Sequence, residues 1–487
     1  MFKLKVTRAA VMSLLLPIAL SSCALIGLDY SRPVISTPTE YANVDKNTDA
    51  NAANVAIAKD WWNLYQDPIL NDLIAKALQN NTDIKSAVAS IEQADAYARE
   101  VGAALFPQVD LDTSGTRSRS SQLTSRSSQP GFQPLSTIYN VQLGTSFEID
   151  FWGKLRRAKE SARALALSSR YAKDTVSLSL SSLIATNYLQ LRSLEAQIAV
   201  SKDNLRSRDE SLALTKRRLA GGVVSNLDVQ QAQVNSSNLV AQIIELERQR
   251  EVTLHLLGLL TGDLSLNLVA TDASNDLKTL PVPPAPPAGL PSALLENRPD
   301  VAQAEQNLVS ANANIGVAKA ALYPTISLTG LFGGESAELG DILKAPARIW
   351  SLGLGLSLPI FDSGRLNSRV DQVTAQQKQS LANYEGAVQT AFTEVNNALV
   401  NVRKNTEREA ALDKSQQAAK EVLRISENRY KAGYTAYLDV LDAQRVYNEA
   451  ATNFIQSRQA RLVATVDLFK ALGGGWQGVK IDEKKSK

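Results

Sequence analysis

The feature that most constrains this chain of 487 residues is an internal repeat. Residues 104–107 (ALFP) recur as residues 321–324 (ALYP), which is a shift of 217 positions. Farther along, residues 227–229 (LDV) recur as residues 438–440, which is a shift of 211. A correspondence held over more than 100 residues indicates a duplicated structural unit. The change in shift predicts six additional residues in the first copy, in a loop between the repeated proline and Gly153.

Alternating residues predict two antiparallel strands in each copy. Large side chains alternate with small or polar ones along residues 139–150 and again along residues 352–360. A period of two gives a strand one apolar face and one polar face. Shorter partner strands are expected at residues 109–113 and 325–332, each just after the shared proline. Residues 114–134, rich in Ser, Arg, Gln and Gly, are expected to form a polar exposed loop.

Each copy continues into a very long helix. The intervals from Gly153 to Gly222 and from Gly364 to Gly433 are each 69 residues long, contain no proline and are rich in helix-forming residues. At 1.5 Å per residue, each helix would be roughly 100 Å long. A shorter return helix is expected after each of them, and a further helix is expected before each pair of strands.

These patterns divide the chain into ten segments. In order, they are a signal peptide (1–22), a lipid-anchored N-terminal segment (23–70), a helix (71–105), a β-hairpin (106–152) and a long helical hairpin (153–262) as repeat 1, a Pro-rich equatorial linker (263–290), a helix (291–323), a β-hairpin (324–362) and a long helical hairpin (363–473) as repeat 2, and a polar C-terminal tail (474–487). The linker contains the run PVPPAPP, a composition typical of a semi-rigid extended strap.

The N-terminus has the pattern of a bacterial export signal. Three basic residues precede an apolar core of 12 residues, which is too short to span a bilayer. Residues 20–23 (LSSC) resemble the lipobox of bacterial lipoproteins, and this resemblance implies that Cys23 carries diacylglycerol and an N-acyl chain. Ala24, in place of Asp, implies sorting to the outer membrane. The alternative for Cys23 is a small buried side chain with no lipid.

Composition excludes several classes of function. One His and one Cys cannot form a His/Cys metal site or a Cys–His nucleophile pair. A net charge of +3 provides no basic footprint for nucleic acid. We find no nucleophile elbow, phosphate loop or catalytic pair of carboxylates in the sequence. We therefore expect no enzymatic activity, no catalytic residue, no metal and no cofactor other than the lipid on Cys23.

Four amphipathic strands are too few to close a barrel. An open sheet in lipid would leave its edge N–H and C=O groups unpaired. Three chains that each contribute four strands would give 12, an even number within the range of bacterial outer-membrane barrels. A soluble β-hairpin is the alternative interpretation of the same alternation. The fold class that we expect from these patterns is therefore a mixed α/β membrane protein with a trimeric 12-stranded barrel and an internal repeat.

Five further motifs carry a resemblance to a known family. They are residues 27–33 (GLDYSRP), 61–70 (WWNLYQDPIL), 151–154 (FWGK), 297–301 (NRPDV) and 441–445 (LDAQR). Together they resemble the TolC family of outer-membrane efflux proteins, and within it the OprM-like lipoprotein branch, over essentially the whole mature chain. The resemblance implies a homotrimer in the Gram-negative outer membrane, whose 12-stranded barrel continues into a long α-helical barrel in the periplasm. It also implies two partners, a periplasmic adaptor (a membrane fusion protein) and an inner-membrane transporter of the resistance–nodulation–division type.

The resemblance also implies roles for particular residues. Adaptor docking is expected at two turns between helices, whose residues are Gly221, Gly222, Val223 and Ser225 in the first copy and Gly433, Tyr434 and Thr435 in the second. These glycines also have a structural explanation, because they can end a helix in the left-handed conformation. The positions matching Leu438, Asp442 and Arg445 form the closing constriction of OprM-like channels. Their spacings of four and three place them on one helix face, where an ordinary surface ion pair is the alternative.

The expected function is a passive outer-membrane exit duct of a tripartite efflux pump for drugs or other toxic small molecules. Two alternatives are also TolC-like, namely a duct for polypeptide secretion and a duct for metal-ion efflux. Secretion ducts of this family usually lack the lipobox, so Cys23 argues against the first alternative. A periplasmic coiled-coil scaffold would explain the helices but not the alternating strands.

Overall fold

The computed structural model describes most of the chain as two compact units. It describes residues 25–36, 38, 41, 57–123, 133–268, 277, 280–284 and 294–477. The first unit combines Ile91–Ser169 and Ala304–Tyr384 with the segment before Val34. The second combines Arg170–Gln303 with the segments Ile35–Ser90 and Glu385 onward. Residues 1–24, and with them the expected signal peptide and Cys23, lie outside the described residues.

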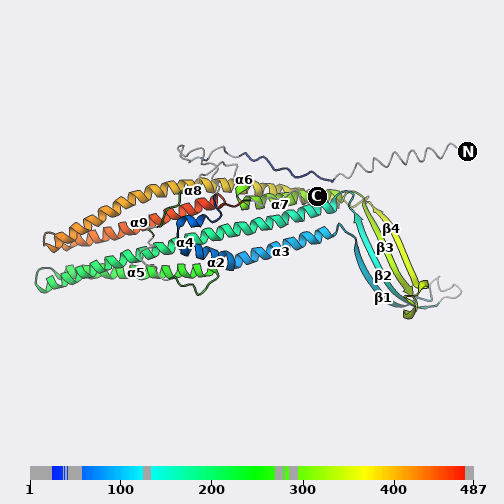
Figure 1. Ribbon diagram of the computed structural model, residues 1–487, viewed down its shortest axis with the longest axis horizontal. Coiled ribbons are helices and arrows are strands. Elements are labelled where there is room, and N and C mark those ends of the chain that lie inside the picture. The colour runs from blue at the N-terminus through cyan, green and yellow to red at the C-terminus, as the bar shows by residue number, and fades with distance from the viewer. Residues whose placement is uncertain are drawn as a thin grey trace. The chain divides into compact units, whose positions relative to one another are not determined.

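The first unit contains a four-stranded antiparallel sheet. Its strands lie side by side in the order β1-β2-β3-β4 (Figure 1). They are β1 (Gln108–Arg119), β2 (Leu135–Ile149), β3 (Thr325–Ser336) and β4 (Arg348–Ser357). Two short 3₁₀ helices, η6 (Leu339–Asp341) and η7 (Ala345–Ala347), lie between β3 and β4.

The two β-hairpins have the same register. Gln108 pairs with Ser146 in the first, and Thr325 pairs with Ser357 in the second, so shifts of 217 and 211 convert one pair into the other. The same shifts convert the pair Arg117 and Thr137 into the pair Gly334 and Arg348, at the far end of the ladder. The six additional residues of the first copy therefore all lie between Arg117 and Thr137. This places them in the connection between the strands, as the predicted loop requires.

The register places most of the apolar residues of the four strands on one face of the sheet. Cross-strand partners share a face, and the pairs Leu111–Leu143, Phe147–Leu328 and Leu328–Leu354 lie on the apolar one. The opposite face presents mainly Ser, Thr, Gly, Asn, Gln and carboxylate side chains. Trp350 lies opposite Phe332 on the apolar face and is 77% exposed. The sheet therefore presents a continuous apolar surface that no other described residues cover.

Several predicted strand limits are wrong. Strand β1 does not end at residue 113, because backbone pairing with β2 continues through polar residues to Arg119. The predicted loop at 114–134 is therefore too long. Strand β3 continues past Phe332 to Ser336, and β4 ends at Ser357, two residues before Pro359. Proline has no N–H to donate to a ladder, which explains the early end of β4. In β1 and β3, backbone pairing continues beyond the residues whose side chains alternate between apolar and polar.

The N-terminal segment 25–36 packs on the first unit beside the sheet. Glu305 is buried and accepts hydrogen bonds from Arg32 at 2.7 and 2.8 Å and from the hydroxyl of Tyr30 at 3.1 Å. Asp29 accepts one from Arg157 at 2.6 Å. The side chain of Trp152 donates to the carbonyl oxygen of Pro324 at 2.7 Å. These contacts explain why the motifs at 27–33 and 151–154 have their particular residues.

Eight α-helices form the rest of the described chain. They are α2 (Pro68–Asn80), α3 (Thr82–Ala103), α4 (Lys154–Ala220), α5 (Asn226–Thr261), α6 (Leu294–Asn297), α7 (Pro299–Ala320), α8 (Arg365–Lys431) and α9 (Tyr437–Ala471), with a 3₁₀ helix, η2 (Trp61–Tyr65), before α2. Helices α4 and α8 are each 67 residues long without interruption. None of the helices in the described part of the chain is both long and apolar enough to cross a membrane.

Two predicted helices are each interrupted once. The expected helix at 71–105 breaks at Asn81, because the Asn81 side chain accepts hydrogen bonds from the backbone N–H groups of Asp83 and Ile84 and so begins a new helix. The expected helix at 291–323 breaks at Arg298, before Pro299. A residue that precedes proline is disfavoured in the α conformation, which accounts for this second break.

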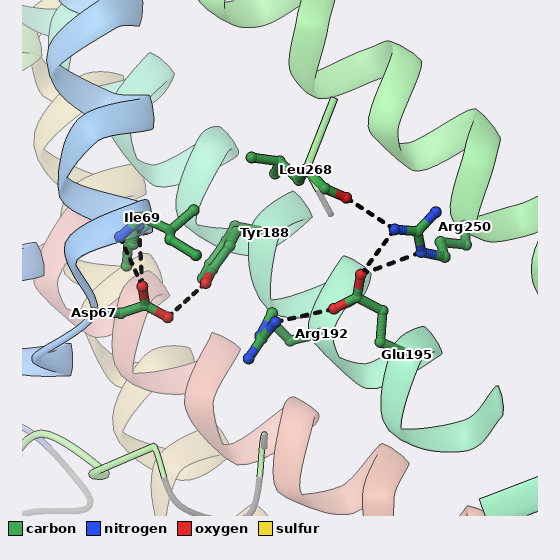
Figure 2. A network of polar contacts seen from close by, with 8 residues as sticks. Asp67, Ile69, Tyr188, Arg192, Glu195, Arg250 and Leu268 are labelled. Carbon is green, nitrogen blue, oxygen red and sulfur yellow. Dashed lines mark hydrogen bonds and ion pairs between the residues drawn. The ribbon is translucent and has the colours of Figure 1, made fainter. Parts of the chain in front are cut away.

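A buried polar network lies within the second unit (Figure 2). Asp67 begins α2 by accepting hydrogen bonds from the N–H groups of Ile69 and Leu70. Its second oxygen accepts from the hydroxyl of Tyr188 on α4 at 2.5 Å. Both Asp67 and Tyr188 are 1% exposed. Burial and the neighbouring carboxylate raise the pKa of Tyr188 above its ordinary value.

Two arginines bind the linker between the repeats at two separate residues. Arg250 of α5 donates to the carbonyl oxygen of Leu268 at 3.0 Å and pairs with Glu195 of α4 (Figure 2). Arg458 of α9 donates to the carbonyl oxygen of Leu280 at 2.8 Å and pairs with Glu409 of α8. Each of these two linker residues is thus bound by a side chain that an ion pair already orients.

Candidate functional site

The two turns predicted for docking have the same backbone structure. Gly222 ends α4 with φ +70°, and Gly433 ends α8 with φ +82°. In the first turn the N–H of Val223 donates to the carbonyl of Arg218 at 2.9 Å, and in the second Tyr434 donates to Arg429 at 2.9 Å. This is the hydrogen bond of a Schellman motif, in which glycine takes the left-handed position. The prediction of left-handed helix ends at these two glycines is confirmed.

The helices that follow the turns begin differently. Ser225 caps α5 in a capping box, in which its side chain and that of Asp228 satisfy each other's backbone N–H groups. The equivalent position before α9 is Ala436, which has no side chain for this task. There the hydroxyl of Thr435 donates to Asp439 instead. The second turn is therefore held by fewer side-chain hydrogen bonds than the first.

Aromatic residues pack the two turns together. Tyr430 and Tyr437 lie with ring centroids 5.3 Å apart, in a cluster that also contains Val229 and Val440. Arg218 lies over the ring of Tyr430, with its guanidinium carbon 4.4 Å from the ring centroid. Its side chain also donates to the carbonyl oxygen of Tyr430 at 3.1 Å. The end of the first helical hairpin is thereby fixed to the end of the second.

Burial affects the ionisation of two groups behind these turns. Burial raises the pKa of Tyr437 to about 12. It lowers the pKa of Arg208, whose guanidinium donates to the carbonyl oxygen of Asn235 at 2.8 Å. Tyr437 therefore stays protonated at neutral pH and contributes through packing, and Arg208 contributes through its hydrogen bonds to Asn235.

The three predicted gate residues share one face of α9. Arg445 donates to Asp442 at 2.9 Å, and both side chains are more than 60% exposed. This hydrogen bond raises the pKa of Arg445. Leu438 lies one turn before Asp442 and is 62% exposed. Arg445 also contacts Glu449 at 3.5 Å, a partner that the sequence interpretation missed although its spacing of four from Arg445 indicates it.

The gate residues line a groove between α5 and α9. Its volume is about 560 Å³, and its walls are Leu227, Gln230, Gln231, Val234, Asn235, Asn238, Leu438, Leu441, Asp442 and Arg445. The residues at matching positions of the first copy, Leu227, Gln231 and Val234, therefore lie in the same groove as the gate residues. Leu227 is 64% exposed and Val234 is 59% exposed. The groove is an apolar surface with one ion pair, and the charged residues come only from the second copy.

These residues can act through charge and through apolar contact. Carboxylate, guanidinium and leucine side chains can attract or repel a solute or a neighbouring chain. The described part of the chain contains no cluster of three or more His, Cys, Asp or Glu side chains that could hold a metal ion. Cys23, the predicted lipid site, lies just before the first described residue, Leu25.

Comparison with known proteins gives a consistent result. Residues 73–263 and 290–474 match the family model described as Outer membrane efflux protein. The chain is 33% identical over 460 residues to the probable efflux pump outer membrane protein TtgC of Pseudomonas putida, covering 94% of this chain and 93% of that protein. It is 31% identical to the cation efflux system protein CusC of Escherichia coli, covering 94% of this chain and 97% of that protein.

The fold is similar to that of a solved outer-membrane channel. The crystal structure of CmeC from Campylobacter jejuni, an outer membrane channel, superposes with a TM-score of 0.85 and 26% sequence identity. The similarity covers 94% of this chain and 96% of that one. Both the helices and the four-stranded sheet therefore have counterparts in a known channel.

Proposed function

This chain belongs to the outer membrane efflux protein family, and from that premise we propose that it is the exit duct of a tripartite efflux pump. The duct conducts drugs or other toxic small molecules passively across the periplasm and the outer membrane. An inner-membrane transporter of the resistance–nodulation–division type supplies the energy. The single observation that carries the proposal is the four-stranded sheet, which has one apolar face and one polar face.

The assembly that the sheet requires is a homotrimer. Strands β1 and β4 are the edges of the sheet, and each pairs with only one other strand in the described chain. Unpaired edge groups are costly in lipid, so another chain has to pair with them. Three copies close a barrel of twelve strands, in which the apolar faces contact lipid and the polar faces line the lumen.

The groove between α5 and α9 supports a closing role for Leu438, Asp442 and Arg445. Leu227 and Val234 on α5 and Leu438 on α9 are exposed, and they would be buried from water only by contact with another surface. Threefold symmetry would bring three copies of the Asp442–Arg445 pair around one axis. We assign the closed state of the duct to this ring.

Two parts of the chain are proposed to contact partners. The turns at the ends of the long helical hairpins bind the adaptor, and the lipid on the N-terminal Cys23 binds the outer membrane. A periplasmic adaptor docks at the two turns, 220–225 and 431–435. Cys23 carries diacylglycerol and an N-acyl chain and anchors the protein to the outer membrane, with the rest of the chain extending into the periplasm. The contacts of Arg32 and Tyr30 with Glu305 support this anchor, because they fix the segment that follows Cys23 to the unit that contains the sheet.

Two measurements test the duct and its assembly. Outer-membrane fractions analysed by electrophoresis without heating should contain a trimer band that boiling converts to monomer. Deletion of the gene should increase susceptibility to drugs and detergents, and the intact gene should restore resistance. A monomer in unheated fractions, or unchanged susceptibility to every compound class, would contradict the proposal.

Metal-ion efflux is the second candidate, and the similarity to the cation efflux protein CusC is the observation that favours it. The two candidates share the same duct and differ in cargo. The deletion strain distinguishes them when copper, silver and zinc salts are included beside the drugs. Sensitivity to the salts alone would establish the second candidate.

A further inference from the structure

The two hairpins share one register, so the junction between them is a template for how the open edges of the sheet pair with another copy. Between the repeats, β2 pairs with β3, and Tyr139 lies opposite Ser336 while Ile149 lies opposite Ile326. This junction joins the second strand of one copy of the repeat to the first strand of the next. In a closed ring of chains, the junction of the same kind is β4 of one chain with β1 of its neighbour.

We propose that β4 of one chain pairs with β1 of a second copy in the register of the β2–β3 junction. The shifts of 211 and 217 that relate the hairpins convert the pair Tyr139 and Ser336 into Trp350 and Arg119 of the neighbouring copy. The pairing then runs through Ser351 opposite the neighbour's Ser118 to Ser357 opposite the neighbour's Asp112. The inference rests on the proposed trimer, and it specifies the contact that holds the trimer together in the membrane.

The pattern of side chains supports this register. Leu352, Leu354 and Leu356 come to lie opposite Arg117, Gly115 and Thr113 of the neighbouring strand. That face of β1 also carries Leu111 and Val109 farther along the strand, so the register places the apolar faces of the two strands on the same side of the sheet. A slip of one residue would turn one strand over and place its leucines in the lumen. Slips of two residues keep the faces matched, and these are the alternatives that an experiment has to separate.

Individual residues at the seam fit their new neighbours. The guanidinium of Arg119 comes beside Trp350, which suits a cation–π contact at the end of the apolar face. On the polar face, the seam pairs the small residues Ser351, Gly353 and Gly355 with serine and threonine of β1. Pro359 takes the position of Glu148 in the template and has no N–H, so the seam ends near Ser357.

Disulfide formation measures the register directly. The variant Ser351→Cys with Ser118→Cys places two cysteines opposite each other, where Cα atoms lie about 4.5–5.5 Å apart and a disulfide can form. Two slipped pairs serve as controls, Gly353→Cys with Ser118→Cys and Ser351→Cys with Thr116→Cys. Their diagonal separation of about 7–8 Å is too long for an unstrained disulfide. The single-cysteine variants control for reaction with Cys23.

Each variant is expressed in cells, and isolated outer membranes are oxidised and analysed on denaturing gels without reductant. The proposal predicts covalent dimers and trimers from the Ser351–Ser118 pair, loss of most of the monomer band, and its return on reduction. Stronger cross-linking of either slipped pair would overturn the register while leaving the trimer intact. Absence of cross-links from all three pairs, in samples that still show the heat-sensitive trimer, would overturn the seam itself. Absence of that trimer would count against the proposed function.

Discussion

The hydroxyl of Tyr188 donates a 2.5 Å hydrogen bond to the carboxylate of Asp67, from one buried side chain to another. This bond connects the start of α2 to the middle of α4. It gives the Asp67 carboxylate a third hydrogen-bond donor, in addition to the two backbone N–H groups that it caps. Buried hydrogen bonds to charged groups are among the stronger single contributions to stability, at about 1.5–3 kcal/mol each. The relationship therefore explains why a tyrosine occurs within a long helix and faces inward.

The variant Tyr188→Phe should be less stable by about 1.5–3 kcal/mol, because the buried Asp67 carboxylate loses one of its hydrogen-bond donors. The measurement is thermal unfolding of the purified protein in detergent, followed by circular dichroism. The control is Tyr434→Phe, because the Tyr434 side chain is 79% exposed on the second turn. Equal melting curves for the two variants would contradict the role of the bond.

The tyrosine ionisation of the folded protein should be incomplete in alkali. Burial raises the pKa of both Tyr65 and Tyr188, so their stabilising contribution is complete below their unfolded pKa and decreases as pH rises toward the folded pKa. At about pH 11, above the pKa of tyrosine in an unfolded chain, we expect the native protein to form fewer tyrosinates than the unfolded protein. Ultraviolet absorbance during a pH titration measures the difference. Full ionisation with unchanged helix content would contradict it.

Arg250 should contribute more to stability than its neighbour Arg248. Arg250 is 22% exposed and satisfies both Glu195 and the carbonyl of Leu268, whereas Arg248 is 60% exposed and pairs only with Glu245 on the same helix. We expect Arg250→Met to cost about 1–3 kcal/mol, because it leaves two partly buried acceptors with fewer donors. The variant Arg248→Met should have no measurable effect. Thermal unfolding of the two variants side by side checks the prediction, which equal losses would refute.

The ion pair of Asp442 and Arg445 should control the closed state of the channel. Replacing both residues by Ala should raise the conductance of single channels in planar bilayers, because the substitution removes the ring of polar contacts that we propose for the closed state. The control replaces Glu421 and Arg424 by Ala, an exposed pair of the same spacing on α8. If the Asp442/Arg445 double variant conducts like the wild type and like the control, the gate assignment is wrong.

Two glycines with similar backbone angles should respond differently to alanine. Gly433 has φ +82° and no atoms near the position of an added Cβ, so Gly433→Ala should cost only the left-handed strain of about 1–2 kcal/mol. Gly473 has φ +89°, and a Cβ there would lie 1.9 Å from the carbonyl oxygen of Asn297. The variant Gly473→Ala should therefore be much less stable or fail to accumulate. Yield and melting temperature of the two variants measure the contrast, and similar values would contradict it.

The sequence was a good guide wherever a periodic pattern lay within one element. The glycines at 153, 222, 364 and 433 bracket α4 and α8, and alternation identified the apolar faces of β2 and β4. It failed where pairing depends on the partner strand. The polar residues from Ser114 to Arg119 have no apolar alternation, and only β2 makes them a strand. Contacts such as Tyr188 with Asp67 join residues 121 positions apart, which local patterns do not reveal.

The candidate site shows the same division. The spacing of Asp442 and Arg445 predicted their pairing, and the structure contains it at 2.9 Å. The groove opposite them required the packing of α5 against α9, because Leu227 and Val234 are ordinary helix residues in the sequence. The sequence repeat identified Leu227, Gln231 and Val234 as the counterparts of Leu438, Asp442 and Arg445. Only the fold shows that both sets of residues line the same groove.

The identical hairpin registers also bear on how such proteins diverge. All six additional residues lie between Arg117 and Thr137, and no strand pair elsewhere in the sheet changes to accommodate them. The connection can therefore lengthen or shorten over generations without altering the wall of the duct.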